Sequence, residues 1–214
     1  MPDLMDTAAA VAWLRAQEGT LPAAERLFDD PFAHLFARGP EECDATKLMV
    51  AAPFVHESIR LRTRYIDDAV RTGLQAGLRH ILILGAGFDC RALRMAEIAA
   101  HPALVFEVDF AAQLARKRDV LTGAGIAIPP YMRMVACDFT CDDYPETLIP
   151  ALAAAGFTVG GGAMVVIEGV LSYLDPPDIH RALACAAAGG ATTRLVFNYP
   201  GSHLASTGNQ SLSS

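Results

Sequence analysis

The sequence predicts an α/β protein: a doubly wound sheet of parallel strands with a helical addition at its N-terminus. Five short runs rich in Val, Ile, Leu and Phe alternate with helical segments over residues 80–199, which is the pattern that a parallel sheet covered on both faces requires. Residues 1–78 show helical periodicity instead. We therefore expect one structural domain with three parts: a helical N-terminal cap (1–78), an α/β core (79–200) and a polar tail (201–214).

Three helical segments are expected in the first part. The stretch DTAAAVAWLRAQE predicts a helix over residues 6–18, with Asp6 or Thr7 as its N-cap. A turn is expected at residues 29–31, with a second helix after it. Residues 50–77 predict one longer helix that closes at a glycine.

The strands of the core are expected at HILIL (80–84), ALVFEVD (103–109), MRMVACDF (132–139), AMVVIEG (163–169) and TRLVFNY (193–199). Helices are expected between them, near residues 89–99, 110–122, 145–155 and 177–188. In a doubly wound sheet, ligands bind at the carboxyl ends of the strands, where the strand order reverses. Each of the first four strands ends in polar or glycine residues, so the sequence predicts a ligand site along this edge.

Composition narrows the classes of ligand and compartment. The net charge of −7 and the pI near 5.3 disfavour a nucleic-acid partner, which usually meets a basic face. Five cysteines without metal-type spacing indicate free thiols in a reducing compartment, and no metal site is expected. No run is long and apolar enough to span a membrane. We expect a soluble, cytoplasmic protein that acts on a small molecule.

The turn after the first strand is a candidate ligand-binding loop. Gly85 and Gly87 let the backbone turn sharply and approach a ligand, and the helix that follows offers free N–H groups. A structural corner is the alternative. The third glycine of the dinucleotide fingerprint is missing, which disfavours a nicotinamide-dependent oxidoreductase. Asp89, which can also cap the helix, is a poor neighbour for a pyrophosphate and suits a ligand with some positive charge.

Acidic side chains at the end of the second strand predict a ribose site. Glu107 and Asp109 point the same way in a strand, and they follow the glycines by about 20 residues, where a carboxylate can accept hydrogen bonds from both ribose hydroxyls. The alternative is that one of them only caps the helix that begins at Phe110. Neither finding separates NAD from S-adenosylmethionine.

The next two strand ends add further candidates. Asp138 can accept a hydrogen bond from an adenine amino group while Phe139 packs against the ring; a helix or turn cap is the alternative for Asp138. Glu168 follows four apolar residues and would lie beside the amino-acid part of a cofactor. A buried carboxylate of this kind needs a partner, and the partner should be cationic.

Arginines on the helix before the first strand can supply that cation. Arg60 and Arg64 lie four residues apart and share a helix face, whereas Arg62 points roughly away. A solvated face is the alternative for such a row. We expect Arg64 to bind the carboxylate of the cofactor.

Several blocks of the chain, taken in order, resemble the leucine carboxyl methyltransferase family, including its bacterial S-adenosylmethionine-dependent members. The blocks are LRTRYIDD, ILILGAGFDCRALRM, VFEVDFAAQLARKRDVL, VACDF and VVIEGVLSYLDP, preceded by DTAAAVAWLRAQE and LFDDPFAHLF, which are similar to the signature of the bacterial branch. The resemblance covers about residues 6–199. It implies a Rossmann-like class I methyltransferase fold and S-adenosyl-L-methionine as the methyl donor.

The resemblance also implies roles for individual residues. A tyrosine in LSYL would lie near the methyl group or the acceptor, with core packing as the alternative. That tyrosine is Tyr173. The other implied roles concern the methyl donor: Arg64 for the methionine carboxylate, Gly85 for the turn beneath it, Asp109 for the ribose, Asp138 and Phe139 for the adenine, and Glu168 for the amino-acid portion.

The expected function is that of an O-methyltransferase acting on a carboxylate or hydroxyl of a small molecule. The resemblance implies seven strands, of which the last two form an antiparallel hairpin beside the fifth, whereas we count five, so we expect the last strands to be missing. The fifth strand would then be an apolar edge through which two copies can pair. The alternative function is a shortened cofactor-binding or interaction protein without turnover.

Overall fold

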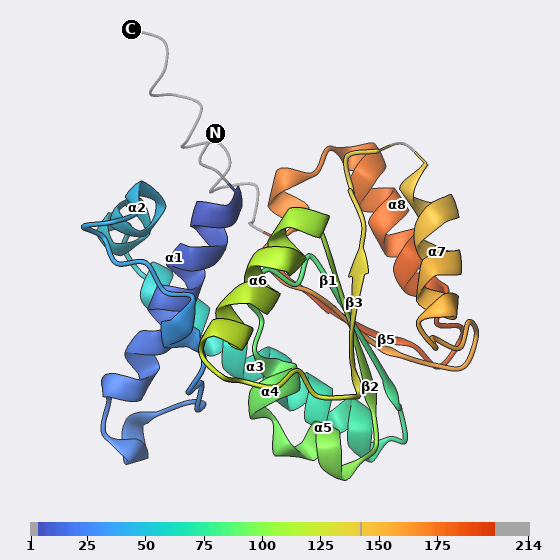
Figure 1. Cartoon of the computed structure of the whole chain (residues 1–214), viewed down its shortest axis with the longest axis horizontal. Helices are drawn as coiled ribbons and strands as arrows, with labels where there is room; N and C mark the ends of the chain where they lie inside the picture. The colour runs from blue at the N-terminus through green and yellow to red at the C-terminus, as the bar shows by residue number, and fades with distance from the viewer. Residues whose placement is uncertain (1–3, 142, 200–214) are drawn as a thin grey trace, which may run out of the picture.

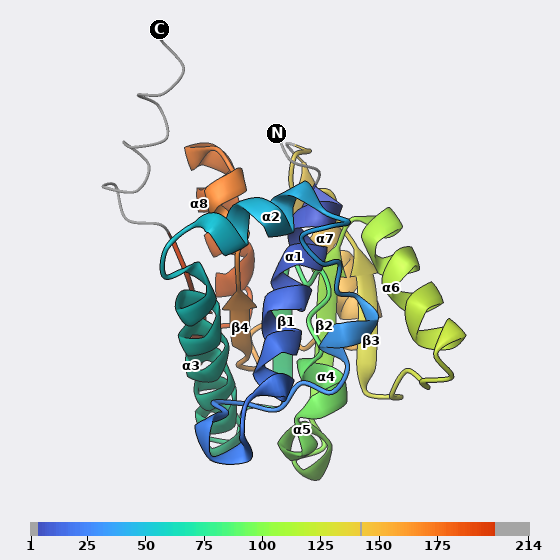
Figure 2. The same ribbon diagram turned by 90° about the vertical axis from the view of Figure 1, so that its left-hand side faces the viewer.

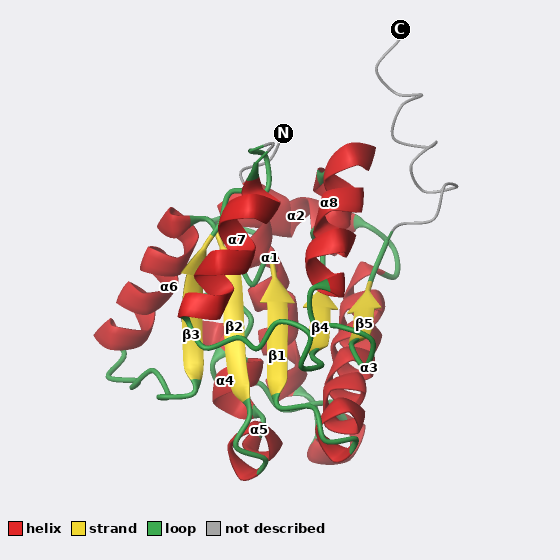
Figure 3. Cartoon of the chain, turned by 90° about the vertical axis from the view of Figure 1, so that its right-hand side faces the viewer, coloured by secondary structure: helices red, strands yellow, loops and turns green. Residues whose placement is uncertain are grey.

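A single parallel sheet forms the centre of the molecule in this computed structural model, which describes residues 4–141 and 143–199. The strands lie in the order β3-β2-β1-β4-β5 (Figure 3), and every neighbouring pair is parallel. Their bounds are His80–Leu84 for β1, Leu104–Asp109 for β2, Met132–Ala136 for β3, Met164–Ile167 for β4 and Arg194–Phe197 for β5. The predicted fold class is confirmed, and each predicted strand is present.

Helices cover both faces of the sheet because each strand alternates its side chains between them. Leu82 and Leu84 of β1 pack on the face covered by α7 (Tyr144–Ala154) and α8 (Pro176–Ala187). Ile81 and Ile83 pack on the other face. That face is covered by α3 (Val55–Gln75), α4 (Arg91–Arg94) and α5 (Ala96–Ala100), as Figures 1 and 3 show.

The N-terminal part is helical as expected, but its boundaries differ. Helix α1 spans Leu4–Gln17, so Asp6 and Thr7 lie inside its first turn and neither is the N-cap. The helix expected after residues 29–31 is only one 3-10 turn, η3 (Ala33–Leu35). Two further 3-10 turns, η1 (Glu18–Thr20) and η2 (Ala23–Glu25), follow α1.

The long helix expected over residues 50–77 is interrupted. Helix α2 (Asp44–Ala51) ends before Pro53, and α3 begins only at Val55. Proline cannot donate the backbone hydrogen bond that a continuous helix needs, and Phe54 adopts a left-handed conformation with φ of 61°. Helix α3 ends before a glycine, as expected, since Gly77 has φ of 93°.

Two elements frame the carboxyl edge of the sheet. Helix α6 (Ala111–Gly123) follows β2. Figure 2 shows α1 in front of β1, and Ala8 of α1 lies against Gly87 in the turn after β1. Phe88, which follows the glycine turn, packs with Ala9 and Ala12 of α1 and with Leu121 of α6. The N-terminal helices are therefore part of the wall around the strand ends.

The outer edge of β5 has no neighbouring strand within the described residues, and Leu195 and Phe197 are 38% and 49% exposed. Pairing of two copies through this edge stays a prediction. The polar tail expected at 201–214 lies outside the described residues. In the part of the chain that the structure describes, no helix has the length and apolar character of a membrane span.

Candidate functional site

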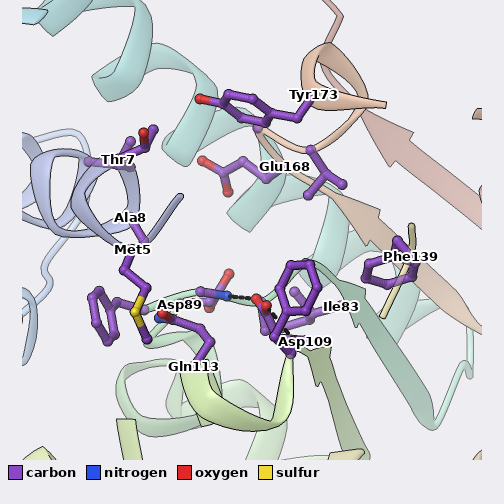
Figure 4. A pocket seen from close by; sticks show the side chains of 18 of the residues that line it. Met5, Thr7, Ala8, Ile83, Asp89, Asp109, Gln113, Phe139, Glu168 and Tyr173 are labelled. Atoms are coloured by element: carbon purple, nitrogen blue, oxygen red, sulfur yellow. Dashed lines mark hydrogen bonds between the residues drawn. The ribbon is translucent and has the colours of Figure 1, made fainter. Parts of the chain in front are cut away.

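A cavity of about 440 Å³ lies at the carboxyl ends of β1, β2 and β4, where the strand order reverses (Figure 4). Its floor is the turn after β1, and one wall comes from α6 and the end of β2. The segment after β4 forms the opposite wall. Helix α1 closes a third side with Met5, Thr7, Ala8 and Val11.

The glycine turn forms part of this cavity. Gly85 and Gly87 have φ of 69° and 49°, in the left-handed region that favours glycine. A Cβ at Gly85 would overlap Cγ2 of Val170, so the absence of a side chain lets the segment after β4 pack against the turn. Both glycines line the cavity, as the ligand-binding interpretation requires.

The two carboxylates of β2 point to the same side of the sheet, but only one reaches the cavity. Asp109 lines it, and its oxygens accept hydrogen bonds from the backbone N–H groups of Gly87 and Phe110, both at 2.7 Å. Burial raises the pKa of Asp109 despite these two donors. Glu107 is fully buried and is bound 2.6 Å from Nζ of Lys117, so it does not face the cavity.

Glu107 should make the stability of the fold depend on pH. Burial raises its pKa from 4.5 to about 7. Because the folded pKa lies above the unfolded value, this carboxyl favours folding below pH 4.5, and that contribution is lost as the pH rises through 7. We expect the free energy of unfolding of wild type, relative to Glu107→Gln, to fall by about 3 kcal/mol between those limits. Urea titrations at a series of pH values measure it, and a flat difference would contradict the assignment.

Asp89 is bound to a residue that the sequence argument did not use. Its carboxylate accepts a hydrogen bond from the backbone N–H of Arg91 at 2.7 Å, so it caps the start of α4, and it also pairs with the Arg91 guanidinium. Burial would raise the pKa of Asp89, but Arg91 more than offsets it and the pKa is lowered. Asp89 lines the cavity as an ionised carboxylate, but Arg91 neutralises its charge, so the preference for a positively charged ligand stays a prediction.

Glu168 has the cationic partners that its position requires. Its two oxygens are bound by Arg62 Nε and Arg91 Nη1, both at 2.8 Å. Burial alone would raise the pKa of Glu168, but these arginines hold it well below its usual range. The carboxylate is therefore ionised at neutral pH and lies on the wall of the cavity.

The expectation that Arg64 faces the site is wrong, and Arg62 lies there instead. Arg64 is 48% exposed and pairs with Asp68 at 2.7 Å. The reason is the phase of α3: its buried stripe includes Ile59 and Ile66, and Arg62 is three residues after the first and four before the second.

Asp138 lies outside the cavity lining. Its side chain is exposed, and it accepts hydrogen bonds from the backbone N–H of Thr140 at 2.9 Å and from the Thr140 hydroxyl at 2.6 Å. The turn-cap alternative is therefore correct for this carboxylate. Phe139 and Thr140 line the cavity in its place, with the ring of Phe139 packed edge-on against Tyr144.

Tyr173 lies on η4 (Leu171–Tyr173), lines the cavity and is 48% exposed, which rules out the core-packing alternative. Other groups contribute to the site although the sequence did not predict them there: Arg15, Arg62, Arg91, Gln113 and helix α1. Arg91 follows the glycine turn directly, and the apolar stripe of α3 locates Arg62. Nothing in the sequence of α1 alone shows that it would close the cavity.

The family profile described as "Leucine carboxyl methyltransferase" matches residues 8–187. The chain belongs to the leucine carboxyl methyltransferase family. The matched residues include every strand end around the cavity and most of α1. These parts of the cavity therefore lie within the region that defines the leucine carboxyl methyltransferase family.

Named relatives agree with this membership. A protein from Parafrankia sp. is 32% identical over 93% of this chain and 61% of its own length, and one from Streptomyces coelicolor is 34% identical over 83% and 62%. Both are named "putative S-adenosyl-L-methionine-dependent methyltransferase". This family member spans about three fifths of the length of the curated relatives it matches.

Solved structures share the fold of this family member. A "putative methyltransferase" from Thermobifida fusca matches with a TM-score of 0.60 and 20% identity, covering 92% of this chain and 66% of that one. A DUF574 family protein from Streptomyces avermitilis matches with a TM-score of 0.58 and 17% identity over 90% and 70% of the two chains. At these identities the likeness shows a shared fold and nothing more.

Proposed function

We propose that this chain is an S-adenosyl-L-methionine-dependent methyltransferase and that the cavity at the ends of β1, β2 and β4 is its donor site. The observation that carries the proposal is the convergence of three features in one cavity: the turn at Gly85 and Gly87, the Asp109 carboxylate, and the Glu168 and Arg62 pair. Family membership supports the same cofactor, because the relatives are named for it.

The residues present fit this cofactor. A nucleoside needs a carboxylate for its ribose hydroxyls, and Asp109 has lone pairs left after accepting two backbone N–H groups. An amino acid needs a cation for its carboxylate and an anion for its ammonium group, and Arg62 and Glu168 provide the two charges side by side. Phe139 offers an apolar surface for the adenine.

When bound, S-adenosyl-L-methionine would supply an activated methyl group on a positively charged sulfur. The chain itself has to orient the two reactants and exclude water. Asp109 would hold the ribose and Arg62 the amino-acid carboxylate, while α1 covers the cavity with Met5, Ala8 and Val11. Tyr173, at the partly open side, would contact the acceptor.

For the acceptor we propose a carboxylate or hydroxyl group of a small molecule. Among the described residues that line the cavity, none is histidine or lysine, and the carboxylates Asp89 and Glu168 are paired with arginines. A neutral alcohol would need a base, whereas a carboxylate is already nucleophilic. The residues that line the cavity therefore favour an acceptor that is ionised before it binds.

We also propose that the protein acts in the cytoplasm and that it does not bind nucleic acid.

Calorimetric titration with S-adenosylhomocysteine tests the donor site. We expect wild type to bind it and Asp109→Asn to bind on the order of ten to a hundred times more weakly, because a charged hydrogen-bond acceptor is lost. Asp119→Asn, an exposed carboxylate on the same helix α6, is the matched control and should bind as wild type does. Folded wild type that does not bind the ligand would refute the proposal.

Transfer of a labelled methyl group to a panel of small carboxylic acids and phenols separates turnover from binding alone. Transfer that Tyr173→Phe or Tyr173→Ala reduces, at unchanged affinity for S-adenosylhomocysteine, supports an enzyme with Tyr173 at the acceptor. Binding without transfer to any member of the panel supports the alternative of a cofactor-binding protein without turnover.

A further inference from the structure

The side chain of Gln113 is a buried polar group without a partner. It lies in the first turn of α6, is only 5% exposed and lines the cavity. Within the described residues, neither its amide nitrogen nor its amide oxygen has a hydrogen-bond partner. Buried amides are normally satisfied, and an unpaired one is costly, so this group points to a ligand.

The usual role of a glutamine at this position is already taken. Gln113 is the third residue of α6 after the N-cap Phe110, where a glutamine side chain commonly accepts the N–H of the N-cap residue. Here that N–H is donated to Oδ1 of Asp109 at 2.7 Å. The amide of Gln113 is therefore left free on the cavity wall by the same contact that fixes Asp109.

The position of Gln113 selects the part of the ligand that it can reach. In Figure 4, Gln113 and Phe139 lie on opposite sides of Asp109. If the adenine packs near Phe139 and the ribose binds Asp109, Gln113 borders the side of the ribose that faces away from the base. The amino-acid end lies elsewhere, at Glu168, on the opposite wall.

The chemistry of a ribose diol matches what Gln113 offers. Both hydroxyl protons can be donated to the Asp109 carboxylate, which leaves the hydroxyl oxygens as acceptors in need of a donor. Asp109 is not a donor when ionised, and the N–H groups of Gly87 and Phe110 are already used. The Gln113 amide supplies an N–H donor at this place.

We propose that Gln113 is a specificity-determining residue of the donor site that donates a hydrogen bond to one hydroxyl of the ribose bound by Asp109. The inference rests on the proposed function and deepens it. Two side chains then recognise the ribose: Asp109 as hydrogen-bond acceptor and Gln113 as donor. A ligand that lacks the hydroxyl bound by Gln113 loses one hydrogen bond to each of them.

The test compares wild type, Gln113→Met and Gln75→Met by calorimetric titration with S-adenosylhomocysteine and with its 2′-deoxy and 3′-deoxy analogues. Methionine keeps the length of the side chain and removes its hydrogen bonds, and Gln75 is an exposed control at the end of α3. We expect Gln113→Met to bind S-adenosylhomocysteine about tenfold more weakly. For one of the deoxy analogues, wild type and Gln113→Met should bind equally, and Gln75→Met should match wild type throughout.

Other outcomes overturn the inference. Equal binding of S-adenosylhomocysteine by wild type and Gln113→Met would show that the Gln113 amide does not contact the methyl-donor ligand. The same loss for all three ligands would indicate a structural role. If Gln113→Met does not fold, Gln113→Leu, which is also uncharged and has no hydrogen-bonding group, takes its place. Wild type that is folded yet does not bind would refute the proposed function itself, which is a distinct result.

Discussion

Replacing Arg91 by methionine is expected to destabilise the protein by about 3–5 kcal/mol. The Arg91 side chain is 3% exposed and contacts three carboxylates: Asp67 at 2.8 Å, Glu168 at 2.8 Å, and Asp89. Burial would lower the pKa of Arg91, but these carboxylates raise it, so the guanidinium stays charged. Removing one partner of a buried ionic group leaves the remaining charges uncompensated, which costs more than the pair contributes.

The loss should be unequal among the three carboxylates. Asp67 keeps two contacts with Arg94, each at 2.7 Å, and Glu168 keeps Arg62. Asp89 loses the guanidinium that neutralises it, beside the glycine turn. We therefore expect the cavity to be disturbed first, and the affinity for S-adenosylhomocysteine to fall even where the variant is still folded.

Urea unfolding followed by circular dichroism measures the effect of Arg91→Met. Arg118→Met is the control, because Arg118 is exposed on α6, and its substitution should change the free energy of unfolding by less than about 0.5 kcal/mol. A cost below about 1 kcal/mol for Arg91→Met would contradict the role of Arg91 in holding α3, α4 and the segment after β4 together.

Gly85→Ala is expected to abolish binding of S-adenosylhomocysteine and to destabilise the fold by about 3 kcal/mol. Two costs add: a left-handed conformation disfavours a side chain by about 1 kcal/mol, and overlap with a well-packed neighbour adds about 1–3 kcal/mol. The neighbour is Val170, whose β-branched side chain has little rotamer freedom to move aside. The segment that carries Glu168 and Tyr173 would have to shift.

Gly125→Ala separates the two costs. Gly125 has φ of 72°, close to the 69° of Gly85, but a Cβ there would meet nothing within 4 Å. We expect this control to lose about 1 kcal/mol and to bind S-adenosylhomocysteine as wild type does. Equal effects of the two substitutions on stability, or intact binding by Gly85→Ala, would show that the packing of Val170 on the turn is unimportant.

The centre of the sheet could be predicted from the sequence because β1, β2 and β4 are buried on both faces. A continuous apolar run such as residues 80–84 has few other structures available to it, and β1 matches that run residue for residue. The N-terminal part was less predictable. The break between α2 and α3 lies at Pro53, a helix breaker that the sequence shows but that the helical periodicity on both sides of it obscures, and at Phe54, whose positive φ no sequence pattern indicates.

The candidate site, too, has features that the sequence predicts and features that it does not. That polar groups gather at the strand ends follows from the fold class, and the need of Glu168 for a cation follows from its burial. Which cation it binds depends on the phase of α3, and the buried stripe through Ile59 and Ile66 would have selected Arg62 over Arg64. Whether Asp138 turns toward the ligand or caps its own turn depends on local geometry that spacing does not reveal.

A crystal structure of the protein with S-adenosylhomocysteine would show whether the cavity at the ends of β1, β2 and β4 is the donor site. We expect the ribose hydroxyls on the Asp109 carboxylate, the adenine beside Phe139, and the amino-acid carboxylate on Arg62 with its ammonium group near Glu168. Ligand bound outside this cavity, or an empty cavity in a well-ordered crystal at saturating ligand, would contradict it.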